Sequence, residues 1–228
     1  VYLSQTTGAG VLTGYRALAK IGPSANGVSF GRYVNTAGNV DYPAMSALTF
    51  GTSVTAQSPT NQLSVFRTGA GAVNASPKVG PVIISEIMYH PPDVGTNDNV
   101  IEEFIELRNT GASTVVLYDP VYPTNGWRLR DAVDFQFNST HSLAAGGSMI
   151  LVSFDPVTNL TALAQFRAKY GSNLFLVGPY SGKLENGSES IELVRPDAPQ
   201  TLGNDAGLVP YLLVEKVVYQ DRGAWPTN

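Results

Sequence analysis

The nine residues EFIELRNTG, at positions 103–111, show a pattern that recurs along this chain, namely a short strand-like run followed by turn residues. Apolar Phe104, Ile105 and Leu107 are interleaved with charged side chains, and the run ends on the turn-forming triplet Asn-Thr-Gly. A short, partly alternating run that is bounded by turn residues is typical of a β-strand at a sheet surface.

Comparable short runs recur along the rest of the chain, with Gly, Pro, Asn or Asp between them. They occupy 81–89, 113–119, 126–131, 133–138, 148–154, 174–180, 189–196 and 212–220. Eight or nine such strands predict an all-β sandwich or barrel. We expect its core to include Phe104, Ile105, Leu107, Trp127, Leu129, Ile150, Val152, Ile191 and Leu193.

One segment, 155–171, has a helical period instead of a strand pattern. Its apolar side chains recur at spacings of three and four, at Leu163, Phe166 and Tyr170. The pattern predicts one short surface helix over about 158–170. The candidate caps are Asp155 or Thr158 at its start and Gly171, in a left-handed conformation, at its end.

The amino-acid composition argues against several classes of protein. The 228 residues are 43% hydrophobic and only 14% charged, with a net charge of −4, which argues against a basic nucleic-acid-binding face. No apolar run reaches the length of a membrane helix. The absence of cysteine excludes disulfides and thiolate sites. Because Ser, Thr, Asn and Gly are abundant, we expect a secreted or cell-surface protein, and the strand pattern at Val1 suggests a piece of a longer one.

The N-terminal part differs from the rest. Residues 29–51 predict a β-hairpin, and 52–80 read as an extended linker, poor in charge, with one strand at most. Residues 1–26 also resemble 191–228, with Val1-Tyr2-Leu3 matching Ile191-Glu192-Leu193, and Tyr15 matching Tyr219. The alternative is that any two hairpins of a Gly- and Thr-rich β-protein look alike.

Several motifs in fixed order resemble the bacterial form of the lamin tail domain over about 82–228. They are VIISEIMYHPP (82–92), EFIELRNTG (103–111), GWRL (126–129), LAAGG (143–147) and ESIEL (189–193). The resemblance implies an immunoglobulin-like antiparallel β-sandwich in a secreted, multidomain bacterial protein, with no catalytic role.

The resemblance also implies a division of the chain. Residues 1–51 resemble the end of a preceding domain, 52–80 are a linker, and 81–228 form the sandwich. The family pattern continues beyond Trp225-Pro226 with a last hairpin, whereas this sequence ends at Asn228. The expected missing strand is found near the N-terminus instead, as the predicted assembly residues Gly27, Val28, Ser29, Phe30, Gly31, Arg32 and Tyr33.

The sequence offers little evidence for a metal site or a catalytic site. His90 ends the strand in SEIMYHPP (85–92), and His141 is the only other histidine, so we predict a structural role for His90 instead of zinc ligation. If a metal binds, calcium is favoured, with Asp93, Asp98 and Glu102 as candidate ligands; the alternative is an exposed polar turn. We expect the paired carboxylates to lie on solvated faces: Glu102, Glu103, Glu106, Glu189 and Glu192.

These features predict a non-catalytic structural or assembly module, without a required cofactor, which contacts copies of itself or neighbouring domains. It would be a repeat or subunit of an extracellular fibre joined by strand completion. The alternative is a module that binds carbohydrate or a calcium-dependent ligand through Trp127, Trp225, Tyr180 or the 93–102 loop. Four Asn-X-Ser/Thr sequons are possible glycosylation sites: Asn74, Asn138, Asn159 and Asn186.

Overall fold

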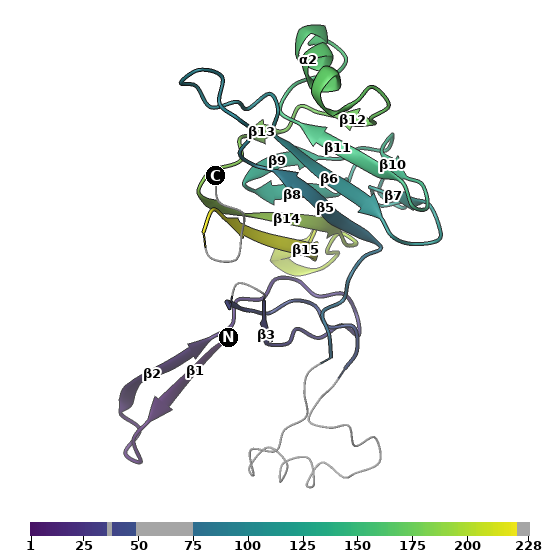
Figure 1. Ribbon diagram of the computed structural model, residues 1–228. Helices are drawn as coiled ribbons and strands as arrows, with labels where there is room; N and C mark the ends of the chain where they lie inside the picture. Colours follow the sequence, from purple (N-terminus) through teal and green to yellow (C-terminus); the bar gives the residue numbers. More distant parts are fainter. Residues whose placement is uncertain (36–37, 49–74, 223–228) are drawn as a thin grey trace. The chain divides into compact units, whose positions relative to one another are not determined.

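The computed structural model describes residues 1–35, 38–48 and 75–222 (Figure 1). The chain divides into two compact units, Val1–Lys78 and Val79–Asn228. Most of the predicted linker, including its one candidate strand, lies outside the described residues, as do Asn74 and Trp225.

The N-terminal unit contains two small antiparallel sheets. They are formed by β1 (Tyr2–Thr6) with β2 (Leu12–Leu18), and by β3 (Tyr33–Val34) with β4 (Val40–Asp41). Isolated bridges extend the second sheet, where Phe30 pairs with Ala44 and Met45 pairs with Pro77. The predicted assembly segment 27–33 therefore pairs with 43–45 of its own unit, through the Gly31 N–H to Pro43 and the Met45 N–H to Ser29.

The two segments of the predicted repeat, 1–26 and 191–228, share a hairpin topology but differ in strand register. Both segments form antiparallel hairpins, but Leu193 pairs with Glu215, four residues before Tyr219. Leu3 pairs with Ala17, two residues after Tyr15. The two registers thus differ by 4 + 2 = 6 residues.

The second unit is a two-sheet sandwich, and β6 lies inside its first sheet. The strand order of that sheet is β12-β11-β6-β5, with β6 antiparallel to both neighbours and β12 parallel to β11. The bounds are β5 (Val82–Met88), β6 (Phe104–Asn109), β11 (Ser148–Val152) and β12 (Leu176–Val177).

The second sheet has the order β13-β9-β8-β14-β15 and is antiparallel throughout. Its strands are β8 (Arg128–Asp131), β9 (Val133–Gln136), β13 (Ser181–Gly182), β14 (Ser188–Pro196) and β15 (Tyr211–Gln220). A two-stranded sheet of β7 (Val115–Val116) with β10 (Ser142–Leu143), and the 3-10 turn Gly203–Asp205, complete the unit. The predicted all-β, immunoglobulin-like sandwich is confirmed.

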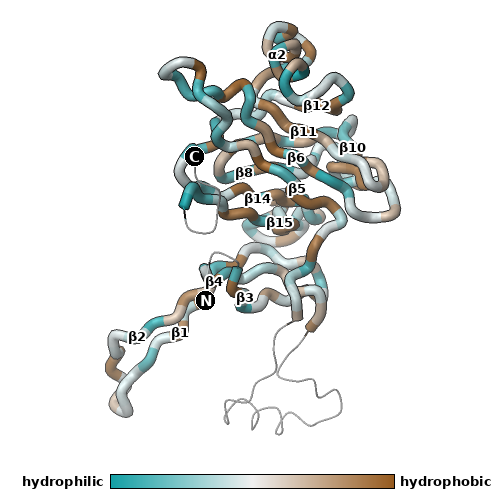
Figure 2. Tube along the Cα trace, viewed as in Figure 1, coloured by the Kyte–Doolittle hydropathy of each residue, from teal (hydrophilic) through white to brown (hydrophobic). Residues whose placement is uncertain are grey.

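The first sheet is buried on its inner face and, around Phe104, Ile150 and Val152, on its outer face as well, which explains why adjacent apolar residues of the predicted core are all buried. Ile105 and Leu107 face the second sheet, within the main cluster that also holds Trp127, Leu129, Ile191 and Leu193. Phe104, Ile150 and Val152 face the other way, against Phe166 of the helix. Figure 2 shows the corresponding hydrophobic segments along β6, β11 and β14. The nine predicted core residues are therefore divided between two clusters.

The predicted helix is α2 (Leu160–Tyr170), two residues shorter at its start than expected. Its N-cap is Asn159, whose side chain accepts the Ala162 N–H at 3.1 Å, and not Asp155 or Thr158. Asp155 instead accepts the Val157 N–H in the turn before the helix. Gly171 ends the helix with φ 113° and ψ 158°, which is a positive φ but not the left-handed helical conformation.

No helix among the described residues has both the length and the apolar character that a bilayer-spanning segment requires.

Candidate functional site

The buried carboxylate of Glu103, which directly precedes β6, is the centre of the candidate site. The residue is 0% exposed. Its Oε2 accepts the Leu184 N–H at 3.0 Å and the Tyr180 hydroxyl at 3.3 Å, whereas its Oε1 has no hydrogen-bond partner in the described structure. Burial raises the pKa of Glu103 to about 7, although both hydrogen bonds favour the charged form.

The prediction that the paired carboxylates all face solvent is wrong for Glu103. Side chains two residues apart on a strand share a face. Glu103 therefore points to the same side as Ile105 and Leu107, into the main core. This spacing was visible in the sequence and could have identified Glu103 as a buried acid.

An ion pair flanks the buried acid. Lys183 Nζ lies 3.1 Å from Asp98 Oδ2, and the Asn186 side-chain amide donates to Asp98 Oδ1 at 3.3 Å. Burial opposes the ionisation of Asp98, but the hydrogen bonds from Lys183 and Asn186 outweigh it, so the pKa of Asp98 lies below its ordinary value. The 93–102 loop and the β13–β14 connection are thereby joined by opposite charges.

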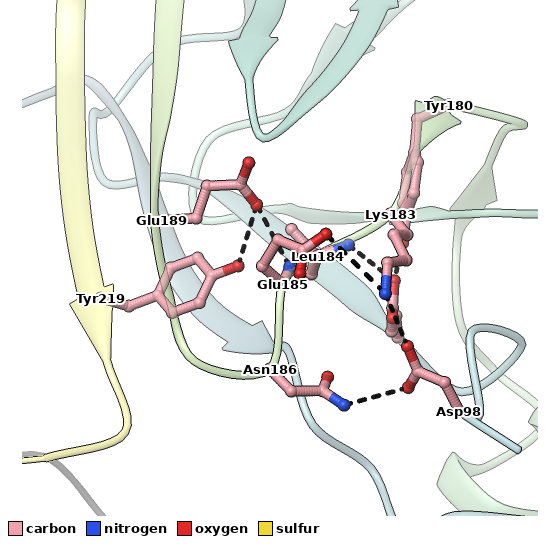
Figure 3. A network of polar contacts seen from close by, with 9 residues as sticks. Asp98, Tyr180, Lys183, Leu184, Glu185, Asn186, Glu189 and Tyr219 are labelled. Atoms are coloured by element: carbon pink, nitrogen blue, oxygen red, sulfur yellow. Dashed lines mark hydrogen bonds and ion pairs between the residues drawn. The ribbon is translucent and has the colours of Figure 1, made fainter.

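A second polar contact lies on the other side of the same connection. Glu189 accepts the Glu185 N–H at 3.1 Å and the Tyr219 hydroxyl at 3.4 Å (Figure 3). The Tyr219 ring stacks on Tyr89, with 4.6 Å between ring centroids. Burial, then the charge of Glu189, raises the pKa of Tyr219, so this phenol stays neutral and serves as a hydrogen-bond donor.

The calcium candidates do not converge on one point. Asp98 is paired with Lys183, and Glu102 forms an ion pair with Lys169 of α2. Asp93 is exposed. Across the described ranges, no group of three or more His, Asp or Glu side chains is placed to hold a metal ion. Lysine side chains from other elements thus supply positive charge at two of the three carboxylates.

The two histidines make different contacts. His141 Nδ1 accepts the Asn138 N–H at 3.0 Å, and its ring meets Phe135 and Phe137 edge to face. Burial lowers the pKa of His141, so the neutral ring is favoured near neutral pH. His90 lies near enough to Asp98 to help lower the pKa of that carboxyl.

Taken together, these contacts hold the 93–102 loop and the β13–β14 connection against the sandwich. Residues 75–201 match the family model described as Lamin Tail Domain, which covers more than half of the chain. The chain belongs to the lamin tail domain family. A search of curated proteins finds no match.

The lamin tail match agrees with the sandwich predicted from the ordered motifs, and it includes every strand of that unit up to β14. Lamin tail domains have an immunoglobulin-like, non-enzymatic fold, which supports the prediction of a structural module. The polar network around Glu103 lies largely within the matched residues, with Tyr219 of β15 beyond them.

Two of the predicted ligand-binding aromatic residues of this lamin tail domain are part of its core. Trp127 is 8% exposed and Tyr180 is 3% exposed, and both belong to the main cluster. A sugar-binding platform needs an accessible ring face, which neither side chain offers. The third candidate, Trp225, lies outside the described residues.

The sequon asparagines of the lamin tail domain already have local hydrogen bonds. Asn138 is exposed and accepts the Thr140 N–H and hydroxyl at 2.9 and 2.6 Å. Asn159 is exposed and caps α2. Asn186 is half-buried beside Asp98, and its Oδ1 is buried without a partner in the described structure. Of these three, Asn186 is the least accessible to a glycan.

Proposed function

We propose that this chain is a structural module of a secreted or cell-surface protein, and that its N-terminal unit joins it to neighbouring lamin tail domains. The observation that carries the proposal is a contrast between the two units. The sandwich has two clusters of buried apolar side chains and exposes others mainly in its loops, whereas the strands of the N-terminal hairpin themselves leave most of their large apolar side chains in solvent. Those exposed by more than 40% include Val1, Tyr2, Leu3, Val11, Leu12, Tyr15, Leu18 and Ile21.

The sandwich has the features of a rigid spacer. The buried carboxylate of Glu103 accepts the Leu184 N–H, and the half-buried carboxylate of Glu215 of β15 accepts the Ile84 N–H of β5. The second contact joins the edge strands of the two sheets. Such contacts hold the ends and edges of the sandwich in place, as a module that transmits force or sets a spacing requires.

The N-terminal unit has the features of a connector. Exposed apolar surface of this extent on a small unit marks a contact site for another protein surface. Residues 27–33 carry the strand pattern that the family places after the Trp-Pro turn, which supports their role in completing another sandwich.

The test is deletion of residues 1–50, followed by light scattering over a range of concentrations and by electron microscopy. We expect the full chain to associate or form linear assemblies, and the shortened chain to remain monomeric and folded. Val121→Ser, which removes a 76% exposed apolar side chain from the sandwich, is the control for a general loss of surface hydrophobicity. Identical behaviour of the full and shortened chains would contradict the proposal.

A further inference from the structure

The β1–β2 hairpin carries an apolar face that no other described part of the chain covers. Leu3 is 68% exposed and Tyr15 is 63% exposed, and both line one hollow of about 380 Å³ together with Ser4 and Gln5. Because Leu3 pairs with Ala17, the latter points to the same side. We refer to Val1, Leu3, Tyr15 and Ala17 as the inner hairpin face.

The matching hairpin of the same molecule buries the corresponding residues. Ile191 and Leu193 of β14 and Tyr219 of β15 are each 0% exposed, and all three belong to the main core cluster. Their matches in the sequence are Val1, Leu3 and Tyr15. The same three apolar positions are thus buried in one hairpin and exposed in the other.

The difference in register does not disturb this correspondence. A slip by one residue would move every side chain of a strand to the opposite face, whereas a slip by an even number returns it to the same face. The two hairpins differ by six residues. Leu3 and Tyr15 therefore lie on one face in either register.

A two-stranded hairpin is at most marginally stable by itself, so it needs a third strand or an apolar surface. The sandwich of this chain has no room for it at the corresponding place, because β14–β15 already pairs there with β8. The partner that fits is a second lamin tail sandwich whose own last hairpin is replaced by β1–β2.

We propose that the inner hairpin face docks β1–β2 onto a second lamin tail sandwich, at the place that β14–β15 fills in this one. The hairpin is then the closing hairpin of a neighbouring domain, and the N-terminal unit is shared between two sandwiches. This inference rests on the proposed function and adds to it a defined surface and a defined partner.

The test is a fusion in which residues 79–190 are placed directly before Val1 of the full chain. Val1 then follows Ser190, as Ile191 does in the sandwich. Hydrogen exchange is measured by mass spectrometry for residues 2–6 and 12–18 in the fusion and in the unfused chain. We expect exchange at least tenfold slower in the fusion, and a second cooperative transition in calorimetry.

Paired variants identify the face. Leu3→Asp with Tyr15→Asp should abolish the added protection and the second transition. Tyr2→Asp with Leu18→Asp, a cross-strand pair on the opposite face, should keep both. Equal exchange in the fusion and the unfused chain, an unfolded added segment, or the same result from both variant pairs would overturn the inference.

The fusion experiment and the deletion of residues 1–50 test the hairpin docking and the connector role independently. If the fusion gives no protection while deletion of 1–50 still abolishes association, the hairpin docking is wrong and the connector role of the N-terminal unit stands. If the fusion is protected but the full and shortened chains behave alike, docking stands and self-association of the unfused chain is wrong.

Discussion

Glu103 and Leu184 hold two distant loops together, because the Leu184 N–H donates to the buried Glu103 carboxylate at 3.0 Å across 81 residues of sequence. The contact joins the start of β6 to the connection between β13 and β14. Tyr180 donates to the same oxygen, so one acidic side chain organises this end of the sandwich.

Glu103 should make the stability of the sandwich depend on pH. Its pKa is about 7 in the folded chain and near 4.5 when exposed, so the folded state binds more protons between these values. Stability is then greatest below about pH 4.5, as far as this group is concerned, and is lost as the pH rises through 7. The difference between the two pKa values corresponds to about 3 kcal/mol.

Urea unfolding of the native protein and of Glu103→Gln at pH 5 and pH 8 checks this. The glutamine is neutral at both values and still offers an oxygen to Leu184, so the variant should lose most of the difference between the two pH values. Glu185→Gln, at an exposed position on the same connection, should retain it. An unchanged pH dependence in Glu103→Gln would contradict the assignment.

Gly126→Ala should destabilise the sandwich strongly. A Cβ atom at this position would lie 1.6 Å from the backbone oxygen of Phe137, which has no flexible end that can move aside. The expected loss is at or above the upper end of about 1–3 kcal/mol for an overpacked site. Gly187→Ala is the matched control, since no atom lies within 4 Å of its Cβ. Equal melting temperatures for the two variants would show that the close approach is not real.

Phe166→Ala should expose the outer face of the first sheet. Phe166 is fully buried between α2 and the sheet, edge to face with Phe104 at 6.0 Å between ring centroids. The expected loss of unfolding free energy is about 3–5 kcal/mol. Leu160→Ala, on the same helix but largely exposed, should cost far less. Comparable losses for both would mean that the helix does not cover this face.

Chelation of divalent ions should leave the melting temperature within a degree. Asp98 and Glu102 are ion-paired with Lys183 and Lys169, so the loop does not need a metal to balance these charges. A bound ion would add stability by mass action, and its removal would lower the melting temperature. If EDTA lowers the melting temperature by several degrees and calcium restores it, the 93–102 loop binds a metal ion and the prediction is wrong.

Two substitutions separate capping from glycosylation at the start of α2. Asn159→Ala removes the side chain that caps Ala162 N–H and should cost about 1 kcal/mol. Thr161→Ala destroys the same sequon but keeps the cap, so its stability should change less in unglycosylated protein. Equal losses in circular dichroism melts would argue against the cap.

The strand pattern, the turn residues and the ordered motifs are sufficient to determine the class of fold. Alternation in EFIELRNTG indicates a strand because side chains on a strand repeat every two residues. Apolar spacings of three and four located the helix between 155 and 171 in the same way. Local pattern is sufficient for these elements because each one buries a face that its own sequence marks.

The spacing of Glu103 from Ile105 and Leu107 indicates an inward-facing acid, but only the tertiary structure decided what each carboxylate contacts. Glu103 meets Leu184 and Asp98 meets Lys183 at separations of 81 and 85 residues, and no local pattern encodes such pairs. Phe104 and Ile105 could not be assigned to opposite cores until α2 was seen to cover the second face. Long-range packing sets the dielectric environment and the hydrogen-bond partners of each acid, and these decide whether a carboxylate serves as a ligand, a surface charge or an internal link.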